Sequence, residues 1–299
     1  MNQNLNQLTY GIVGLGIMGG SIAKAIRTNV LSSVGEGAVT GKIFALDKNN
    51  ESLYAACTAG VIDQAFTPSE TEKMLGQCDV LFICLYPHAT LEFLQTHKNH
   101  YKDDAVITDI SGVKALIQAD FNSLCPTNAH LVLGHPMAGG EKEGFAASKG
   151  EYFTNHNYII ITQKNDEKND EARALLEKLV GAMGFTRITK TDSSTHDSKI
   201  GFTSQLCHVV ASVMVESAED PEITSFGGGS FEDLTRIAMI NAPLWTELFL
   251  SNKEKLIAHI ETFKKHMNEI EKLIETEDKE GLKSLLLDVR EKRIQMQKN

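Results

Sequence analysis

Hydrophobic residues in the first two-thirds of the 299-residue chain form short runs that alternate with longer amphipathic stretches. Short continuous apolar runs predict buried strands, and apolar residues three and four positions apart predict helices. The predicted strands are Tyr10–Val13, Lys42–Leu46, Val80–Leu85, Ala105–Asp109, Leu131–Gly134 and Tyr158–Thr162. Helical stretches such as Ser21–Thr28 and Leu91–His97 separate several of them. Because strands joined through helices are parallel, the pattern predicts a doubly wound α/β sheet.

The pattern becomes helical almost throughout from about residue 190. A helix at Glu171–Met183 and a strand at Phe185–Lys190 are predicted to close the α/β part. A late helix then carries an apolar stripe in alternating steps of four and three. The stripe consists of Leu256, Ile260, Phe263, Met267, Ile270 and Ile274. Such a stripe is typical of a coiled-coil seam or, more often, of a helical bundle core. We therefore predict two domains, residues 1–189 and 190–299.

Composition narrows the class of protein. Hydrophobic residues make up 42% and charged residues 23%, which is typical of a soluble globular protein. The 29 basic residues against 39 acidic ones give a net charge of −10, which disfavours nucleic-acid binding. No apolar run approaches the roughly 18 residues of a membrane span, and the N-terminal stretch has no signal-peptide pattern. Five scattered cysteines without a CxxC pair disfavour disulfides and zinc, so we expect a cytoplasmic protein without a metal.

A glycine-rich segment, GLGIMG at residues 14–19, connects the first predicted strand to a predicted helix. Its G-x-G-x-x-G spacing is that of dinucleotide-binding loops. In such loops Gly14 would permit the tight turn, Gly16 the approach of the pyrophosphate, and Gly19 the packing of helix on strand. The helix N-terminus attracts the phosphate charge. A glycine-rich turn without a ligand is the alternative, but the flanking strand and helix favour a Rossmann-type dinucleotide-binding domain.

The second predicted strand ends in Asp47. An acidic residue there accepts hydrogen bonds from the adenosine ribose and repels a 2′-phosphate, although a surface turn would also explain it. It comes later than the usual spacing of about 20 residues, because residues 29–41 insert a loop. Lys48 could soften the repulsion, but no arginine is near, so we predict NAD rather than NADP. The predicted cofactor-binding residues are Gly14, Gly16, Ile17, Met18, Gly19, Asp47, Lys48, Leu85 and Pro87.

Four further segments carry most of the remaining candidate chemistry. They are DISGVK at residues 109–114, GHPMAGGEK at 134–142, the helix from His196-Asp197 to His208, and FGGG at 226–229 with Thr235-Arg236 and Trp245. Together with the glycine loop, they resemble the prephenate dehydrogenase family, including its arogenate-using relatives. The resemblance implies a Rossmann domain followed by an all-helical dimerisation domain, and a homodimer. It also implies NAD-dependent oxidative decarboxylation of prephenate to 4-hydroxyphenylpyruvate in tyrosine biosynthesis.

The implied reaction needs a proton acceptor, because a hydride leaves C4 of the substrate while the C4 hydroxyl loses its proton. A neutral imidazole with a pKa near about 6.5 suits that role. The family's catalytic histidine maps onto His135, which follows a strand end; a capping or core histidine is the alternative. In many relatives the serine that orients this histidine stands where this chain has Gly112, so Ser111 is the catalytic candidate, through a shifted loop or a water.

A dianionic substrate in an acidic protein needs local cations. The family's ring-carboxylate arginine maps onto Arg236, whose guanidinium can bind a carboxylate bidentately; a solvated helix-face charge is the alternative. His196 and Asp197 are left out of the predicted site, because an acidic residue near a helix start can simply complement the helix dipole. The predicted substrate-binding residues are Arg236, His208, Ser204, Gln205, Gly140 and Glu141.

Three other functions stay open. Gln205 replaces a histidine common in relatives, and Gly140 replaces a threonine, so prephenate and arogenate are both possible substrates, prephenate being the commoner. The β-hydroxyacid dehydrogenases share the glycine loop and a helical second domain, but they use a catalytic lysine, for which Lys199 is the candidate. A non-catalytic NAD-binding sensor is the last alternative, and it predicts cofactor binding without turnover.

Overall fold

The computed structural model describes residues 4–32, 40–140, 142–163 and 166–296. Within these residues the main sheet has six parallel strands in the order β3-β2-β1-β4-β5-β6. The strands are β1 (Thr9–Val13), β2 (Lys42–Leu46), β3 (Gln64–Phe66), β4 (Val80–Ile83), β5 (Val106–Asp109) and β6 (His130–Leu131). The strand order reverses between β1 and β4, where doubly wound sheets bind their ligands. The predicted doubly wound α/β sheet is confirmed.

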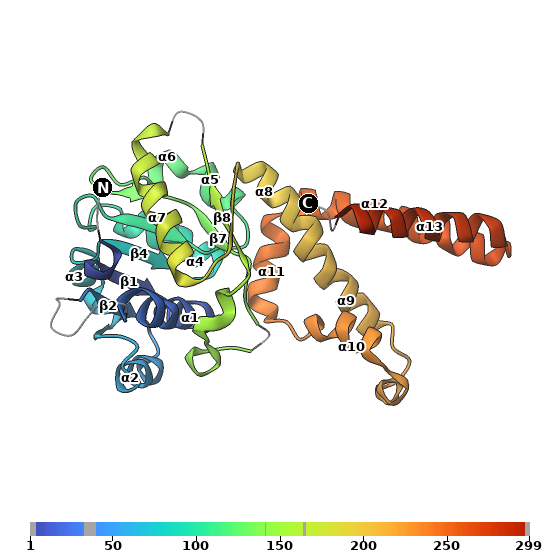
Figure 1. The fold of residues 1–299 in the computed structure, drawn as a ribbon, viewed down its shortest axis with the longest axis horizontal. Helices are drawn as coiled ribbons and strands as arrows, with labels where there is room; N and C mark the ends of the chain where they lie inside the picture. Colours follow the sequence, from blue (N-terminus) through green and yellow to red (C-terminus); the bar gives the residue numbers. More distant parts are fainter. Residues whose placement is uncertain (1–3, 33–39, 141, 164–165, 297–299) are drawn as a thin grey trace.

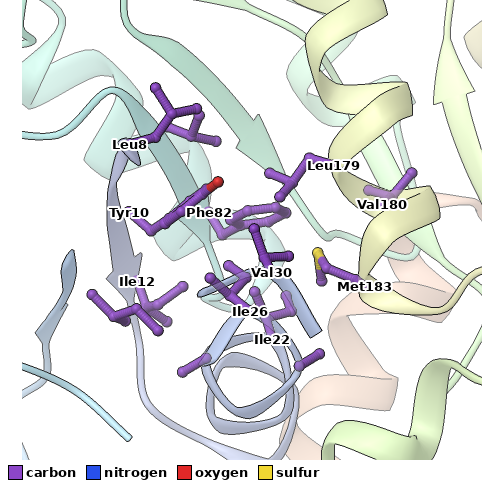
Figure 2. Packing of buried hydrophobic residues seen from close by; sticks show 14 of the residues in the cluster. Leu8, Tyr10, Ile12, Ile22, Ile26, Val30, Phe82, Leu179, Val180 and Met183 are labelled. Carbon is purple, nitrogen blue, oxygen red and sulfur yellow. The ribbon is translucent and has the colours of Figure 1, made fainter. Parts of the chain in front are cut away.

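Helices cover the sheet and bury its apolar faces (Figure 1). They are α1 (Ile17–Ala25), continued by a π-helical segment (Ile26–Leu31), α2 (Asn50–Thr58), α3 (Thr71–Leu75), α4 (Pro87–His97), α5 (Ala115–Ala119), α6 (Phe121–Leu124) and α7 (Asp170–Met183). Figure 2 shows Ile22 of α1 and Leu179 of α7 packed beside Phe82 of β4, and all three side chains are buried. This packing fixes the start of α1, and with it the glycine loop, against the strand ends.

A second sheet departs from the sequence prediction. Its order is β7 (Gly134–Pro136), β8 (Asn157–Ile161) and β9 (Arg187–Thr191), with β7 antiparallel and β9 parallel to β8. The single strand predicted at Leu131–Gly134 is therefore wrong, and the strand predicted at Tyr158–Thr162 does not belong to the main sheet. The neighbouring strand changes within one apolar run. The Val132 N–H donates to the Ile107 carbonyl of β5, whereas the Leu133 carbonyl accepts from the Ile161 N–H of β8. An apolar run shows burial but not which strand is its neighbour.

The last third is helical and extends away from the sheet (Figure 1). It contains α8 (Ser193–Ile200), a π-helical turn (Gly201–Leu206), α9 (Cys207–Glu216), α10 (Gly229–Thr235), a 3-10 turn (Arg236–Ala238), α11 (Ala242–Ser251), α12 (Lys253–Glu275) and α13 (Lys279–Met296). Along α12, Leu256 is buried, but Met267 is 53% and Ile274 60% exposed. The apolar stripe is therefore not a bundle core within one chain. Of the helices described, none has the length and apolar character to span a bilayer.

Candidate active site

A cleft of about 630 Å³ lies between the carboxyl edge of the main sheet and the C-terminal helices. Its wall contains the ends of β4 and β7, the start of α1, and helices α9 and α11. The predicted site residues that line it are Gly16, Ile17, Met18, Gly19, Leu85, Pro87, Ser111, His135, Gly140, Ser204, Gln205, His208 and Arg236. Residues predicted from separate segments of the chain are thus brought to one space.

The glycine loop has the geometry of a phosphate cradle. Gly14 has a φ of +89°, a conformation that favours glycine, and it forms the turn behind the cleft. A Cβ on Gly19 would lie 1.9 Å from the Gly14 carbonyl oxygen, so only glycine lets α1 pack on this turn. A Cβ on Gly16 would meet no atom within 4 Å. The N-terminus of α1 therefore faces an open space that a pyrophosphate can approach.

Asp47 lies beside the glycine loop but does not line the cleft described above. Its carboxylate accepts the Leu15 N–H at 2.5 Å and the Asn49 N–H at 2.7 Å. The bond from Leu15 holds the end of β2 against the loop, and the bond from Asn49 closes a local turn. Each carboxylate oxygen keeps a further lone pair for a ribose hydroxyl. Lys48 is exposed to solvent next to it.

His135 is the first member of a hydrogen-bonded series of three side chains. Its Nδ1 lies 2.9 Å from Nε2 of His196, whose Nδ1 lies 2.6 Å from Oδ1 of Asp197. An ionised carboxylate only accepts, so His196 donates from Nδ1 and accepts at Nε2, and His135 must donate from its Nδ1. The Nε2 of His135 then carries a lone pair. Since His135 lines the cleft, this arrangement provides a base there.

The Asp197 carboxylate also joins the two parts of the chain. Oδ1 accepts the Lys114 N–H at 2.9 Å and Oδ2 the Ala115 N–H at 2.8 Å, both at the start of α5. Burial raises the pKa of Asp197, but the hydrogen bonds from His196 and from these amides outweigh it, so the pKa lies below its usual value. Asp197 is therefore ionised when it orients His196.

A buried ion pair lies beneath His135. The Lys114 ammonium is fully buried, 2.7 Å from Oδ2 of Asp109, and it donates to the Gly134 carbonyl. Burial of His135, the neighbouring His196 and the Lys114 charge together hold the pKa of His135 well below 6.5. The His135 imidazole is therefore neutral at physiological pH, the form that a general base requires.

The Ser111 hydroxyl lies at the cleft without a hydrogen-bond partner among the described residues, although it is buried. A buried polar group normally has a partner, so this hydroxyl is available to a bound molecule. Gly112 lies beside the base, since a Cβ there would be 3.8 Å from Nε2 of His135 and 3.2 Å from Cδ2 of Leu248. The glycine leaves room for Leu248 of α11 to pack against the catalytic loop.

The C-terminal helices contribute the polar groups on the other wall. Arg236, in the turn after α10, faces the cleft together with Ser204 and His208. The His208 ring lies 3.5 Å from the Trp245 ring, centroid to centroid, and its Nδ1 donates to the Ser204 carbonyl. Arg236 can supply a positive charge and Trp245 an apolar face, which suits a carboxylate on a flat ring.

Gln205 lines the cleft, and its side chain forms hydrogen bonds to other residues of the protein. Its side-chain nitrogen donates to the Leu248 carbonyl at 2.8 Å, and its oxygen accepts from the Asn252 side chain at 2.8 Å. Its second side-chain N–H and the remaining lone pair of its oxygen are the groups that a substrate could still contact. Gly140 is exposed at the cleft mouth. Glu141, the last predicted substrate contact, lies outside the described residues.

Sequence reasoning left out three residues that the structure brings to this site. His196 and Asp197 stay outside the predicted site, where the helix dipole explains Asp197 alone, and Lys114 enters only as the last residue of the DISGVK segment. The signal for the first two was the buried face of α8, on which Ser193, His196, Asp197 and Ile200 recur at helical spacing. Lys199, the candidate of the β-hydroxyacid alternative, is exposed and is not part of the cleft wall.

Comparison with known proteins gives matches over both parts of the chain. The family model described as "Prephenate dehydrogenase, nucleotide-binding domain" matches residues 33–185, and "Prephenate dehydrogenase, dimerization domain" matches residues 192–288. Prephenate dehydrogenase of Lactococcus lactis subsp. cremoris is 31% identical over 278 residues, covering 91% of this chain and 72% of that protein. The enzyme of Bacillus subtilis is 29% identical over 288 residues, covering 93% and 74%.

A solved structure shares the whole architecture. Prephenate dehydrogenase from Aquifex aeolicus, in complex with hydroxyphenyl propionate and NAD+, has a TM-score of 0.84 and 30% identity. The match covers 98% of this chain and 100% of that one. With these matches in both parts of the chain, and a cleft that joins a glycine-rich loop to an oriented histidine, this chain belongs to the prephenate dehydrogenase family.

Proposed function

We propose that this protein catalyses the NAD-dependent oxidative decarboxylation of prephenate to 4-hydroxyphenylpyruvate. The observation that carries the proposal is the orientation of His135 by His196 and Asp197 at the edge of the cleft that Gly16 and α1 also line. A base and a phosphate cradle on one cleft are what a hydride-transferring dehydrogenase needs. The open space in front of Gly16 fits the pyrophosphate of NAD, which when bound accepts the hydride.

The chain's own residues supply the proton transfer. Nε2 of His135 takes the proton of the C4 hydroxyl while the hydride leaves C4. The imidazolium that forms is stabilised through His196 by the Asp197 carboxylate, as in other triads of this kind. The bond from the ring to its carboxylate then breaks, CO₂ leaves, and the electron pair of that bond completes the aromatic ring. The C4 oxygen becomes a phenolate and takes the proton back from the His135 imidazolium. The Ser111 hydroxyl, which has no hydrogen-bond partner among the described residues, is proposed to bond the C4 oxygen or the cofactor amide.

Substrate orientation depends on the other wall of the cleft. Arg236 is proposed to bind the ring carboxylate, and His208 with Ser204 the side-chain carboxylate, so that the C4 hydroxyl faces His135. Charge-assisted bonds of this kind are about twice as strong as neutral ones. Gly140 is kept as a contact at the cleft mouth and Glu141 as a further substrate contact. The alternative substrate, arogenate, differs from prephenate in carrying an ammonium group in place of the side-chain keto group.

The domain division and assembly are also proposals. A boundary at residues 189 and 190 is supported by the gap between the two family matches, which end at 185 and begin at 192. The description of the second family as a dimerization domain, with the exposed apolar side chains of α12, supports a homodimer. A cytoplasmic location is proposed for a biosynthetic enzyme of this kind.

The direct test is the initial rate of cofactor reduction with prephenate or arogenate, each with NAD or NADP. We expect rapid NADH formation with prephenate and NAD. Activity with arogenate alone would keep the proton transfer but change the substrate. Folded protein that binds NAD and reduces neither cofactor would favour the sensor function instead.

Replacement of Asp47 tests the cofactor assignment. Asp47→Ser removes the charge that opposes a 2′-phosphate, so the ratio of kcat/KM for NADP to that for NAD should rise by about tenfold or more, which corresponds to about 1.4 kcal/mol. Glu51→Ser, on exposed α2 nearby, is the matched control and should leave the ratio unchanged. An unaltered ratio in the Asp47 variant would remove this residue from cofactor selection.

Replacement of His135 tests the base. His135→Asn should lower kcat by about 10²-fold or more and leave the dissociation constant of NAD unchanged, because the side chain acts on the hydroxyl proton. In the parent enzyme, protonation of His135 stops the reaction. Its depressed pKa therefore predicts that the acid limb of kcat/KM lies below pH of about 6.5. The control His266→Asn, on α12, should change neither kcat nor the acid limb of kcat/KM. Normal turnover by His135→Asn would exclude this mechanism.

Replacement of Arg236 tests the carboxylate contact. Arg236→Ala should weaken substrate binding by roughly 2–4 kcal/mol, about 30- to 1000-fold in KM, through loss of a charge-assisted pair. Arg236→Lys keeps the charge but loses the planar fork, so its KM should fall between those of the parent and the alanine variant. A parental KM for Arg236→Ala would assign the ring carboxylate to another group.

A further inference from the structure

Three metal-ligating side chains that the proposed reaction does not use gather where α3 meets the end of α4. Glu72 lies in α3, His97 is the last residue of α4, and His100 follows a two-residue turn. One ligand atom from each lies within 4.8 Å of the other two. Nε2 of His100 is 3.2 Å from Oε1 of Glu72. No short sequence motif contains all three residues, because β4 separates Glu72 from the two histidines along the chain.

Two ring nitrogens in this cluster lack partners. Nδ1 of His97 and Nδ1 of His100 are both buried atoms, and neither has a hydrogen bond to any described residue. The His97 ring packs on Phe93, with ring centroids 4.6 Å apart, and lies 6.1 Å from the His100 ring. Buried polar atoms are normally satisfied by protein, water or an ion. The contact between Glu72 and His100 leaves both of these nitrogens without a hydrogen bond to any described residue.

We propose that Glu72, His97 and His100 bind a divalent transition metal ion of the Zn²⁺ class. Two imidazole nitrogens and one carboxylate oxygen are a ligand set that zinc uses with a water in the fourth position. Mg²⁺ and Ca²⁺ prefer oxygen ligands, so this set discriminates against them. Ligand atoms of a tetrahedral site with bonds of about 2.0–2.2 Å lie about 3.4 Å apart, so the cluster must close slightly on the ion. The Glu72 side chain is 65% exposed and can make that movement.

The proposed metal site is separate from the cleft. α4 begins at Pro87, which lines the cleft, and the helix runs for 11 residues, about 15 Å, before it ends at His97. An ion there would tie α3 to the end of α4, beneath the opposite edge of the main sheet. Its effect would be on the stability of this part of the fold rather than on proton transfer.

The test is isothermal titration of the tag-free, EDTA-treated chain with ZnCl₂, and the visible absorption of bound Co²⁺. We expect one equivalent bound with tetrahedral Co²⁺ bands, no binding of Mg²⁺, and a melting temperature that rises with zinc concentration. His97→Gln and His100→Gln should each weaken binding by at least about tenfold, and Glu72→Gln should also weaken it. Melting temperatures measured in EDTA verify that each variant folds.

Two controls make the result specific. His266→Gln removes an exposed histidine whose Nδ1 lies 2.9 Å from Glu269, a pair for which the described residues offer no third ligand, and it should bind zinc like the parent. His135→Asn removes the histidine of the cleft and should also keep the site. Parental affinity in the His97 and His100 variants, binding lost only in His135→Asn, or no binding to the parent chain would each overturn the proposal.

Discussion

The Asp197 carboxylate is the interaction on which the site depends. It belongs to α8, the first helix of the C-terminal part. It nevertheless accepts hydrogen bonds from two backbone N–H groups at the start of α5, in the α/β part, and a third from Nδ1 of His196. The first two bonds fix the position of α8 on the sheet, and the third fixes the tautomer of His196 and so of His135. With fewer donors the pKa of this carboxyl would be higher, because burial alone raises it. Domain contact and base orientation therefore rely on the same charge.

The overall architecture could be predicted from the sequence, because strand burial and helical periodicity are local signals. The glycine loop was identified by spacing, and its geometry bears out the reason for glycine at residues 14 and 19. The second sheet could not be predicted, since Leu133 and Gly134 continue an apolar run whose hydrogen-bond partners change from β5 to β8. Pairing between strands distant in sequence leaves little trace in the sequence of one strand.

The candidate site was only partly predictable for a related reason. His135 and Arg236 have the residue types that the proposed reaction needs, so the sequence alone indicates a role for each. His196 orients another side chain, and this contact appears only when β7 and α8 lie side by side. The hydrogen bonds of Gln205 to Leu248 and Asn252 also appear only in the folded chain. The type of a residue predicts the chemistry it can perform, but the direction and partners of its side chain are known only from the tertiary structure.

Charge in the cleft follows from the same packing. The protein carries a net charge of −10, but the buried charges near His135 include the Lys114 ammonium as well as the Asp109 and Asp197 carboxylates. Lys114 is fully buried in an ion pair with Asp109. Burial of His135, the neighbouring His196 and the Lys114 charge together depress the pKa of His135. A depressed pKa makes His135 a weaker base but keeps it unprotonated. The hydrogen bond to His196, which Asp197 orients, stabilises the imidazolium of His135 as it forms. The buried lysine therefore favours the neutral form of His135, and the buried carboxylate favours its protonated form.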